Sequence, residues 1–193
     1  MASRRNKAIF LDRDGVINKD PESINKYKYV TRRGEFVFLP GAKKAVRKLT
    51  EAGYAVYIIS NQAGVGKGYF TMEDLRSVNG YMTGEIRKAG GRITAAYYCP
   101  HRKEDDCRCR KPKAGLFRKA LKRGAMDLKM TYFIGDNVRD VQAGRAIGCR
   151  TILVLSGKTK KRDVAKLDVK PDHVKRDLLD AVEFILAKEK GER

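Results

Sequence analysis

Short apolar runs alternate with amphipathic segments along nearly the whole chain, and this alternation narrows the possible folds more than any other feature. Five apolar runs rich in β-branched and aromatic residues predict strands, at 7–11, 54–60, 92–98, 130–135 and 150–155. Segments with apolar residues at helical spacing predict helices, at 41–53, 71–90, 114–124, 137–147 and 177–188. Such alternation is typical of a parallel sheet covered by helices on both faces. The predicted fold class is therefore α/β, a doubly wound parallel sheet.

The length and apolar content predict a single domain over residues 1–193. Apolar residues make up 42% of the chain, which is enough for one hydrophobic core without disulfides or a partner subunit. No apolar stretch reaches the roughly 18 residues that a membrane-spanning helix needs. The first residues, MASRRNK, are basic, but the apolar run AIFL behind them is too short for a signal peptide. We therefore expect a monomeric, cytoplasmic protein that does not enter membranes.

The chain is strongly basic, with 43 lysines and arginines against 23 acidic residues and a net charge of +20. The electrostatic field of this net charge attracts anions, and both nucleic acid and a small phosphorylated metabolite are compatible with it. The basic residues are spread along the chain, and no basic patch interleaved with aromatic residues appears. The sequence therefore favours the small phosphorylated metabolite and disfavours nucleic acid as the partner.

Polar residues follow the predicted strands at the positions where each strand ends. Ligands of parallel sheets bind beyond the carboxyl ends of the strands, so these residues should meet at one edge of the sheet. Four sets follow the first four strands in order: Asp12-Arg13-Asp14-Gly15, Ser60-Asn61-Gln62, Arg110-Lys111-Pro112 and Gly135-Asp136-Asn137. The sequence thus predicts one polar site built from four segments.

The residue types in these sets suit phosphoryl transfer. Of Asp12 and Asp14, one carboxylate can attack phosphorus to form an aspartyl phosphate. The other can give a proton to the leaving oxygen and later take one from water. Carboxylates repel phosphate, so a hard cation such as Mg²⁺ is needed between them, and Asp136 offers a second carboxylate ligand. Lys111 and Ser60 can donate to the charged phosphoryl oxygens.

Each set also has an ordinary structural interpretation. An aspartate after a strand often only caps a turn. Asp136 and Asp140 could cap the helix at 137–147, and Lys111 could be a solvated surface residue. This interpretation requires four coincidences at successive strand ends. The joint functional interpretation is therefore favoured.

The apolar strand followed by LDRDGVIN resembles the first motif of the haloacid dehalogenase superfamily of phosphatases. Ser60, Lys111 and GDNVRD (135–140) resemble its second, third and fourth motifs. More narrowly, ISNQAGVGKGYFT (59–71) and YYCPH with CRCRKP (97–112) resemble the D-glycero-D-manno-heptose 1,7-bisphosphate 7-phosphatases and the related histidinol-phosphate phosphatases. The resemblance runs from about residue 7 to 187. It implies the Rossmann-like fold of that superfamily with a minimal cap.

The resemblance implies a role for each catalytic position. Asp12 would be the nucleophile and an Mg²⁺ ligand. Asp14 would be the general acid/base, and its main-chain carbonyl would also reach the metal. Asp136 would complete the protein ligands of Mg²⁺. Ser60 and Lys111 would hold the phosphoryl oxygens.

The resemblance also implies how substrate is held. Asn61 and Arg110 would help to orient it. A pocket for two phosphates would use a basic rim formed by Lys67, Arg110, Lys111 and Lys113. Asn137 stands where the heptose bisphosphate phosphatases often carry lysine, and Asp140 would act only through its neighbours. Members of this branch lack a large cap domain, so three loops would shape the pocket, near 13–39, 61–70 and 99–111.

A potential second metal site lies in a segment of eleven residues that holds three cysteines and a histidine: Cys99, His101, Cys107 and Cys109. Three thiolates and an imidazole complete a tetrahedral Zn²⁺ site and leave no position for substrate. Buried reduced cysteines are the alternative, but the polar segment HRKEDD between them does not suit a core. We expect a structural Zn²⁺ in the loop 99–109 that places Arg110 and Lys111. Cys149 stands apart and is expected to be buried and inert.

Three functional hypotheses follow. The leading one is Mg²⁺-dependent hydrolysis of the 7-phosphate of a heptose 1,7-bisphosphate through an aspartyl phosphate. The second is a histidinol-phosphate phosphatase. The third, suggested by the net charge and by related motifs in polynucleotide 3′-phosphatases, is a nucleic-acid 3′-phosphatase or a nucleic-acid-binding protein.

Overall fold

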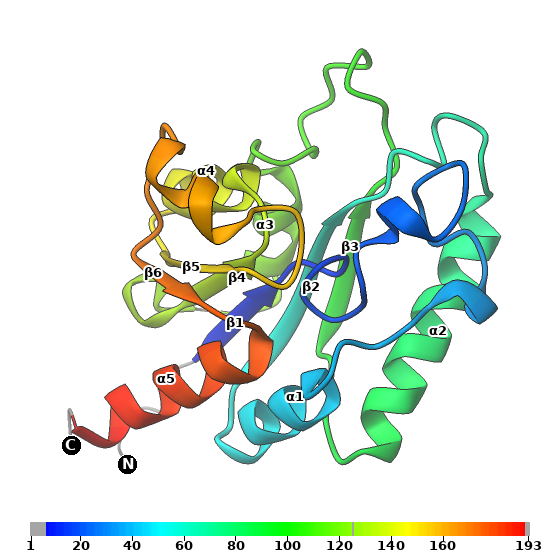
Figure 1. The fold of residues 1–193 in the computed structure, drawn as a ribbon. Helices are drawn as coiled ribbons and strands as arrows, with labels where there is room; N and C mark the ends of the chain where they lie inside the picture. The colour runs from blue at the N-terminus through cyan, green and yellow to red at the C-terminus, as the bar shows by residue number, and fades with distance from the viewer. Residues whose placement is uncertain (1–6, 125, 192–193) are drawn as a thin grey trace.

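In a computed structural model, which describes residues 7–124 and 126–191, a single parallel sheet runs through the centre of the molecule (Figure 1). Its six strands are β1 (Ala8–Leu11), β2 (Ala55–Asn61), β3 (Ala95–Cys99), β4 (Tyr132–Gly135), β5 (Arg150–Val154) and β6 (His173–Lys175). They lie in the order β3-β2-β1-β4-β5-β6, and every neighbouring pair is parallel. This confirms the predicted α/β class and the doubly wound parallel sheet.

The described residues form five α-helices, which are α1 (Ala42–Glu51), α2 (Met72–Lys88), α3 (Gly115–Leu121), α4 (Val138–Ile147) and α5 (Leu178–Gly191). Local sequence sets several of their ends. Thr71 and Asp74 form a capping box at the start of α2, and Asn137 and Asp140 form another at the start of α4. α4 ends at Gly148, whose φ of 78° is a left-handed conformation that glycine adopts readily. The predicted helices therefore lie close to the observed ones.

The helices pack on both faces of the sheet, so the hydrophobic core has two halves (Figure 1). α1, α2 and α5 bury apolar side chains against one face, together with Ile9, Leu11 and Ile134. α3 and α4 cover the other face, together with Phe10 and Phe133. Successive residues of a strand point to opposite faces, so a strand covered on both sides must be apolar throughout. All four residues of β1 are buried, which explains the continuous run AIFL.

The sixth strand is a difference from the sequence prediction, which had five. β6 pairs with β5, with His173 opposite Ile152 and Lys175 opposite Val154. Its three residues, HVK, contain no apolar run, so nothing in the local sequence distinguishes it from a loop. β3 and β4 also begin later than predicted. β4 begins at Tyr132 because residues 128–130 form a short 3₁₀ helix.

The order of the strands creates the space for a site. From β1 the chain moves to β2 and β3 on one side, and it then returns to β4 on the other side of β1. At such a switch point the connections leave in opposite directions and open a crevice at the carboxyl ends of the two strands. The residues that follow β1 and β4 therefore border the same space.

Two expectations concern membranes and targeting. Among the described residues, no helix is both long and apolar enough to cross a membrane. Residues 1–6, which carry most of the basic segment considered for a signal peptide, lie outside the described part of the chain.

Candidate active site

The predicted site residues meet in one pocket at the carboxyl ends of the central strands. The pocket encloses about 300 Å³, a size that suits a small metabolite. Its lining includes all the residues predicted for catalysis and Mg²⁺ ligation and, of those predicted for substrate contact, all but Lys113: Asp12, Asp14, Ser60, Asn61, Lys67, Arg110, Lys111 and Asp136. The three loops expected to shape the pocket each contribute to it.

Three carboxylates converge in this pocket. One oxygen from each of Asp12, Asp136 and Asp140 lies within 4.8 Å of the other two. β1 places Asp12 and its neighbour β4 places Asp136, whereas Asp140 comes from the first turn of α4. Carboxylate oxygens are the ligands that Mg²⁺ prefers. These three carboxylates could hold that ion. Asp140 was expected to act only through its neighbours, but its carboxylate belongs to the group itself.

Lys111 neutralises part of this negative charge. Its Nζ lies 2.8 Å from Oδ2 of Asp12 and 2.7 Å from Oδ1 of Asp140, and its side chain is only 2% exposed. Burial alone lowers the pKa of Lys111, but the charges of Asp12 and Asp140 outweigh burial and raise it. The ammonium group is therefore a permanent cation beside Asp12.

The buried carboxyl groups resist ionisation. Burial is the largest cause that raises the pKa of Asp140 to about 6, against the opposing charge of Lys111 and with the help of the charge of Asp12. The pKa of Asp136 is raised well above its usual range by burial and then by the charges of Asp140 and Asp12. One lysine does not balance three carboxylates. This imbalance favours the binding of a divalent cation.

Close backbone packing fixes Asp136. Its Oδ2 accepts a hydrogen bond of 2.7 Å from the backbone N–H of Lys158. A Cβ built on Gly15 would lie 2.2 Å from that oxygen, and one built on Gly157 would lie 2.0 Å from it. Gly15 also has a φ of 77°, which disfavours any other residue. A side chain at either glycine would displace the carboxyl group of Asp136.

The motif at the end of β2 contacts the third motif directly. Asn61 Nδ2 donates to the carbonyl of Lys111 at 3.2 Å, and the N–H of Lys111 donates to Asn61 Oδ1 at 3.0 Å. These two bonds fix the main chain that carries the ammonium group. Ser60 is buried, and its Oγ accepts a hydrogen bond of 3.3 Å from Gln62. Asn61 therefore positions Lys111 as well as lining the pocket.

Basic and aromatic side chains form the rim of the pocket. Lys67 Nζ lies 5.9 Å from the ring centroid of Tyr29, and Arg110 extends from the end of the cysteine-rich loop. Lys113, expected in the same rim, instead pairs with Asp106. The sequence identified the loops but missed several residues that line the pocket. Four of these lie on the first loop, and two lie elsewhere, on α4 and after β5: Pro21, Tyr27, Lys28, Tyr29, Arg139 and Lys158.

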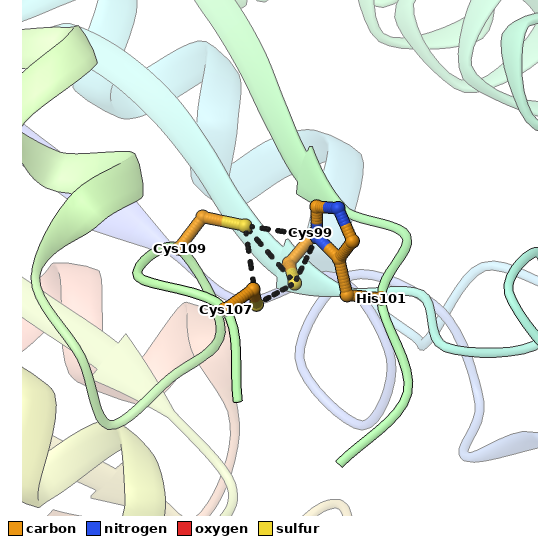
Figure 2. A group of neighbouring side chains, drawn as sticks. All are labelled: Cys99, His101, Cys107 and Cys109. Carbon is orange, nitrogen blue, oxygen red and sulfur yellow. Dashed lines mark hydrogen bonds between the residues drawn. The ribbon is translucent and has the colours of Figure 1, made fainter. Parts of the chain in front are cut away.

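The four residues of the predicted Zn²⁺ site converge at the end of β3 and in the loop that follows it (Figure 2): Cys99, His101, Cys107 and Cys109. Cys109 Sγ lies 3.3 Å from Cys99 Sγ and 3.5 Å from Cys107 Sγ, and His101 Nδ1 lies 3.2 Å from it. Zn–S bonds of about 2.3 Å in a tetrahedron separate sulfur atoms by about 3.8 Å. The cysteines are free thiols, so a small outward shift would let them hold Zn²⁺.

The cysteine-rich loop leads directly into the third motif, since Arg110 and Lys111 follow Cys109 in the chain. A metal at the cluster would therefore fix the segment that enters the pocket. Cys149 lies elsewhere, before β5, and is 5% exposed. Its burial agrees with the prediction, and burial raises the pKa of its thiol to about 12.

Comparison with known proteins agrees with this geometry. The HAD-hydrolase-like family model matches residues 108–181, which hold the third and fourth motifs. A D-glycero-beta-D-manno-heptose-1,7-bisphosphate 7-phosphatase from Neisseria meningitidis is 38% identical over 182 residues, which cover 93% of this chain and 95% of that protein. The chain belongs to the haloacid dehalogenase-like family of phosphatases.

The names of further relatives of this phosphatase specify different anomers of the heptose bisphosphate. A D-glycero-alpha-D-manno-heptose-1,7-bisphosphate 7-phosphatase from Campylobacter jejuni is 38% identical over 159 residues, or 82% of this chain and 88% of that protein. Among solved structures, the D,D-heptose 1,7-bisphosphate phosphatase from B. bronchiseptica, complexed with magnesium and phosphate, matches with a TM-score of 0.86. It is 33% identical, and the match covers 94% of this chain and 99% of that one. The predicted superfamily is confirmed.

Proposed function

We propose that this phosphatase removes the 7-phosphate of D-glycero-D-manno-heptose 1,7-bisphosphate by Mg²⁺-dependent hydrolysis through an aspartyl phosphate. The observation that carries the chemistry is the convergence of Asp12, Asp136 and Asp140 around the buried ammonium group of Lys111. Relatives named for this activity, at 38% identity over 93% of the chain, support the substrate.

Two aspartates after β1 share the covalent chemistry. Asp12 attacks phosphorus, so that a new O–P bond forms while the ester P–O bond breaks. Asp14 gives its proton to the leaving alkoxide. It then takes a proton from the water that attacks the phosphorus, and the bond to Asp12 breaks as inorganic phosphate forms. Both aspartates are regenerated.

The negative charge of the reacting phosphate must be balanced by cations and hydrogen-bond donors. Asp12, Asp136 and the main-chain carbonyl of Asp14 would hold Mg²⁺, which would offset the repulsion between carboxylates and phosphate. Lys111 and Ser60 would hold the phosphoryl oxygens and stabilise their charge during transfer.

The rim of the pocket suits a second phosphate. Arg110 and Lys67 both line the pocket beside the reacting centre. With Asn61 we propose them as the residues that orient a bisphosphate, with one phosphate at Asp12 and the other among the basic side chains. The sugar alcohol carrying the reacting phosphate would span the space between them.

We propose that the cysteine-rich loop binds one structural Zn²⁺. Three cysteines and one histidine would occupy all four positions of a tetrahedron, which leaves none for substrate. The ion would hold the loop after β3 so that Arg110 and Lys111 reach the pocket. We further propose that the enzyme acts as a cytoplasmic monomer, and size-exclusion chromatography checks the oligomeric state.

A panel of substrates tests the proposed function. We expect the highest kcat/KM on a heptose 1,7-bisphosphate, and both anomers should be measured separately. Histidinol phosphate and a 3′-phosphorylated oligonucleotide complete the panel. A higher kcat/KM on histidinol phosphate would replace the proposed substrate by that of the related enzymes. A higher value on the oligonucleotide would restore the nucleic-acid hypothesis.

A further inference from the structure

Buried hydrogen-bond donors surround the carboxyl group of Asp14, and the proposed mechanism gives these donors no role. The guanidinium of Arg13 lies beside the carboxylate, with Nη2 at 2.9 Å from Oδ1 and 3.0 Å from Oδ2. Asn18 Nδ2 donates to Oδ1 at 2.9 Å, and Gln62 Nε2 donates to Oδ2 at 2.8 Å. Arg13, Asn18 and Gln62 are all fully buried. Five hydrogen bonds, including one of 3.1 Å from Arg13 Nε to Oδ1, therefore determine where the carboxyl group of Asp14 lies.

The amide of Gln62 can take only one orientation among these donors. Its Oε1 accepts a hydrogen bond of 3.1 Å from Arg13 Nη2, and its Nε2 donates to Asp14. The same Nε2 lies 3.3 Å from Ser60 Oγ. A flipped amide would place its nitrogen against the guanidinium and its oxygen against the carboxylate, and both contacts would be repulsive. Gln62 thus links the phosphate-holding hydroxyl to Asp14.

Only a narrow edge of Asp14 faces the pocket. Its side chain is 16% exposed, and it lines the pocket together with Asp12. Proton transfer requires a donor within about 2.6–3.2 Å of the leaving oxygen. Arg13 donates to both oxygens, Asn18 adds a donor at Oδ1, and Gln62 is the neutral donor at Oδ2. Without Gln62, Oδ2 would be held by Arg13 alone, and the carboxyl group could turn toward Asn18 and away from the leaving oxygen.

We propose that Gln62 is a positioning residue for proton transfer and holds Asp14 where it can protonate the leaving alkoxide. The inference rests on the proposed function, in which the proton passes from Asp14 to the alkoxide oxygen as the P–O ester bond breaks. An alkoxide leaves poorly without that proton, whereas 4-nitrophenolate is a stable anion that leaves without one. Gln62 therefore matters for alkyl phosphates and matters little for an aryl phosphate.

The test compares kcat/KM on two substrates, because kcat/KM reports the steps up to the first phosphoryl transfer and omits hydrolysis of the intermediate. Gln62→Leu should lower kcat/KM by about 100-fold on the heptose bisphosphate and by less than about fivefold on 4-nitrophenyl phosphate. Gln142→Leu, on α4, is the matched control and should change neither. Equal losses on the two substrates, or no loss on either, would overturn the inference.

A second variant protects the test against misfolding. Gln62→Glu keeps the shape of the side chain and can still accept from Arg13, but its carboxylate cannot donate to Asp14, so the same selective loss is expected. In an Asp14→Asn background, Gln62→Leu should cause no further loss on the alkyl phosphate, because both changes act through one residue. A further loss of full size would show that Gln62 acts independently. Retained turnover in Asp12→Asn would instead refute the covalent mechanism itself.

Discussion

Replacement of Lys111 by methionine should show how much one buried cation contributes to the free energy of unfolding. The ammonium group lies 2.8 Å and 2.7 Å from carboxylate oxygens of Asp12 and Asp140. Methionine has a similar length and volume, so the loss of charge dominates the effect and a cavity contributes little. The substitution leaves three carboxylates together without their nearest cation.

The structure sets the size and pH dependence of the loss. Removing one partner of a buried ion pair costs about 3–5 kcal/mol. Asp140 already has a pKa of about 6 beside Lys111, and without the ammonium group that pKa rises further. A carboxyl group whose folded-state pKa exceeds its unfolded value favours folding below the unfolded pKa, and this contribution is lost as pH rises through the folded pKa. The deficit of Lys111→Met should therefore grow between about pH 5 and about pH 8 and approach the full 3–5 kcal/mol there.

Urea unfolding in magnesium-free buffer measures this deficit. The chain contains no tryptophan, so far-ultraviolet circular dichroism is the suitable signal. Lys113→Met is the matched control, because its side chain is 45% exposed and its partner Asp106 is 91% exposed. Such surface pairs contribute about 0–1 kcal/mol. In turnover assays, Lys111→Met should also lower kcat by about 10²–10³, since it removes a donor to the phosphoryl oxygens.

Two results would refute this reasoning. One is a loss of stability in Lys111→Met no larger than in Lys113→Met. The other is a loss that does not change with pH, because the excess buried charge would then not be its cause. Adding Asp140→Asn to Lys111→Met should recover part of the lost stability at about pH 8, since it removes one unpaired buried carboxylate.

Three further predictions concern the proposed nucleophile and the two proposed metal sites. Asp12→Asn should abolish phosphate release while the circular dichroism spectrum stays unchanged, and residual turnover near the parent value would exclude Asp12 as the nucleophile. Purified protein should contain about one zinc per chain by atomic absorption, and Cys109→Ser should lose it while Cys149→Ser keeps it. Mg²⁺ affinity, measured by calorimetry, should weaken as pH falls, because the proposed ligand Asp136 has a raised pKa and binds a proton in place of the metal. An affinity that stays constant down to about pH 5 would show that Asp136 does not ligate the ion.

Much of the site was predictable because a parallel sheet gathers the ends of its strands at one edge. Asp12, Ser60 and Asp136 each follow an apolar run, and that position alone predicted that they would meet. The Cys/His spacing is likewise a local pattern, readable within a dozen residues. In these features, the residues that meet are either close together in the sequence or placed at the same edge of the sheet by their strands.

Other contacts were decided by the tertiary structure. The pairing of Lys111 with Asp140 joins a loop after β3 to the first turn of α4, and Gln62 reaches Arg13 across 49 positions of sequence. β6 adds a strand that has no apolar run of its own. In each case the residue types were visible, but their partners depend on side-chain rotamers and on how far each helix and loop packs onto the sheet. The sequence by itself determined which chemical groups reach the edge of the sheet. Only close packing in a water-poor interior decided which of those groups neutralise, orient or repel one another.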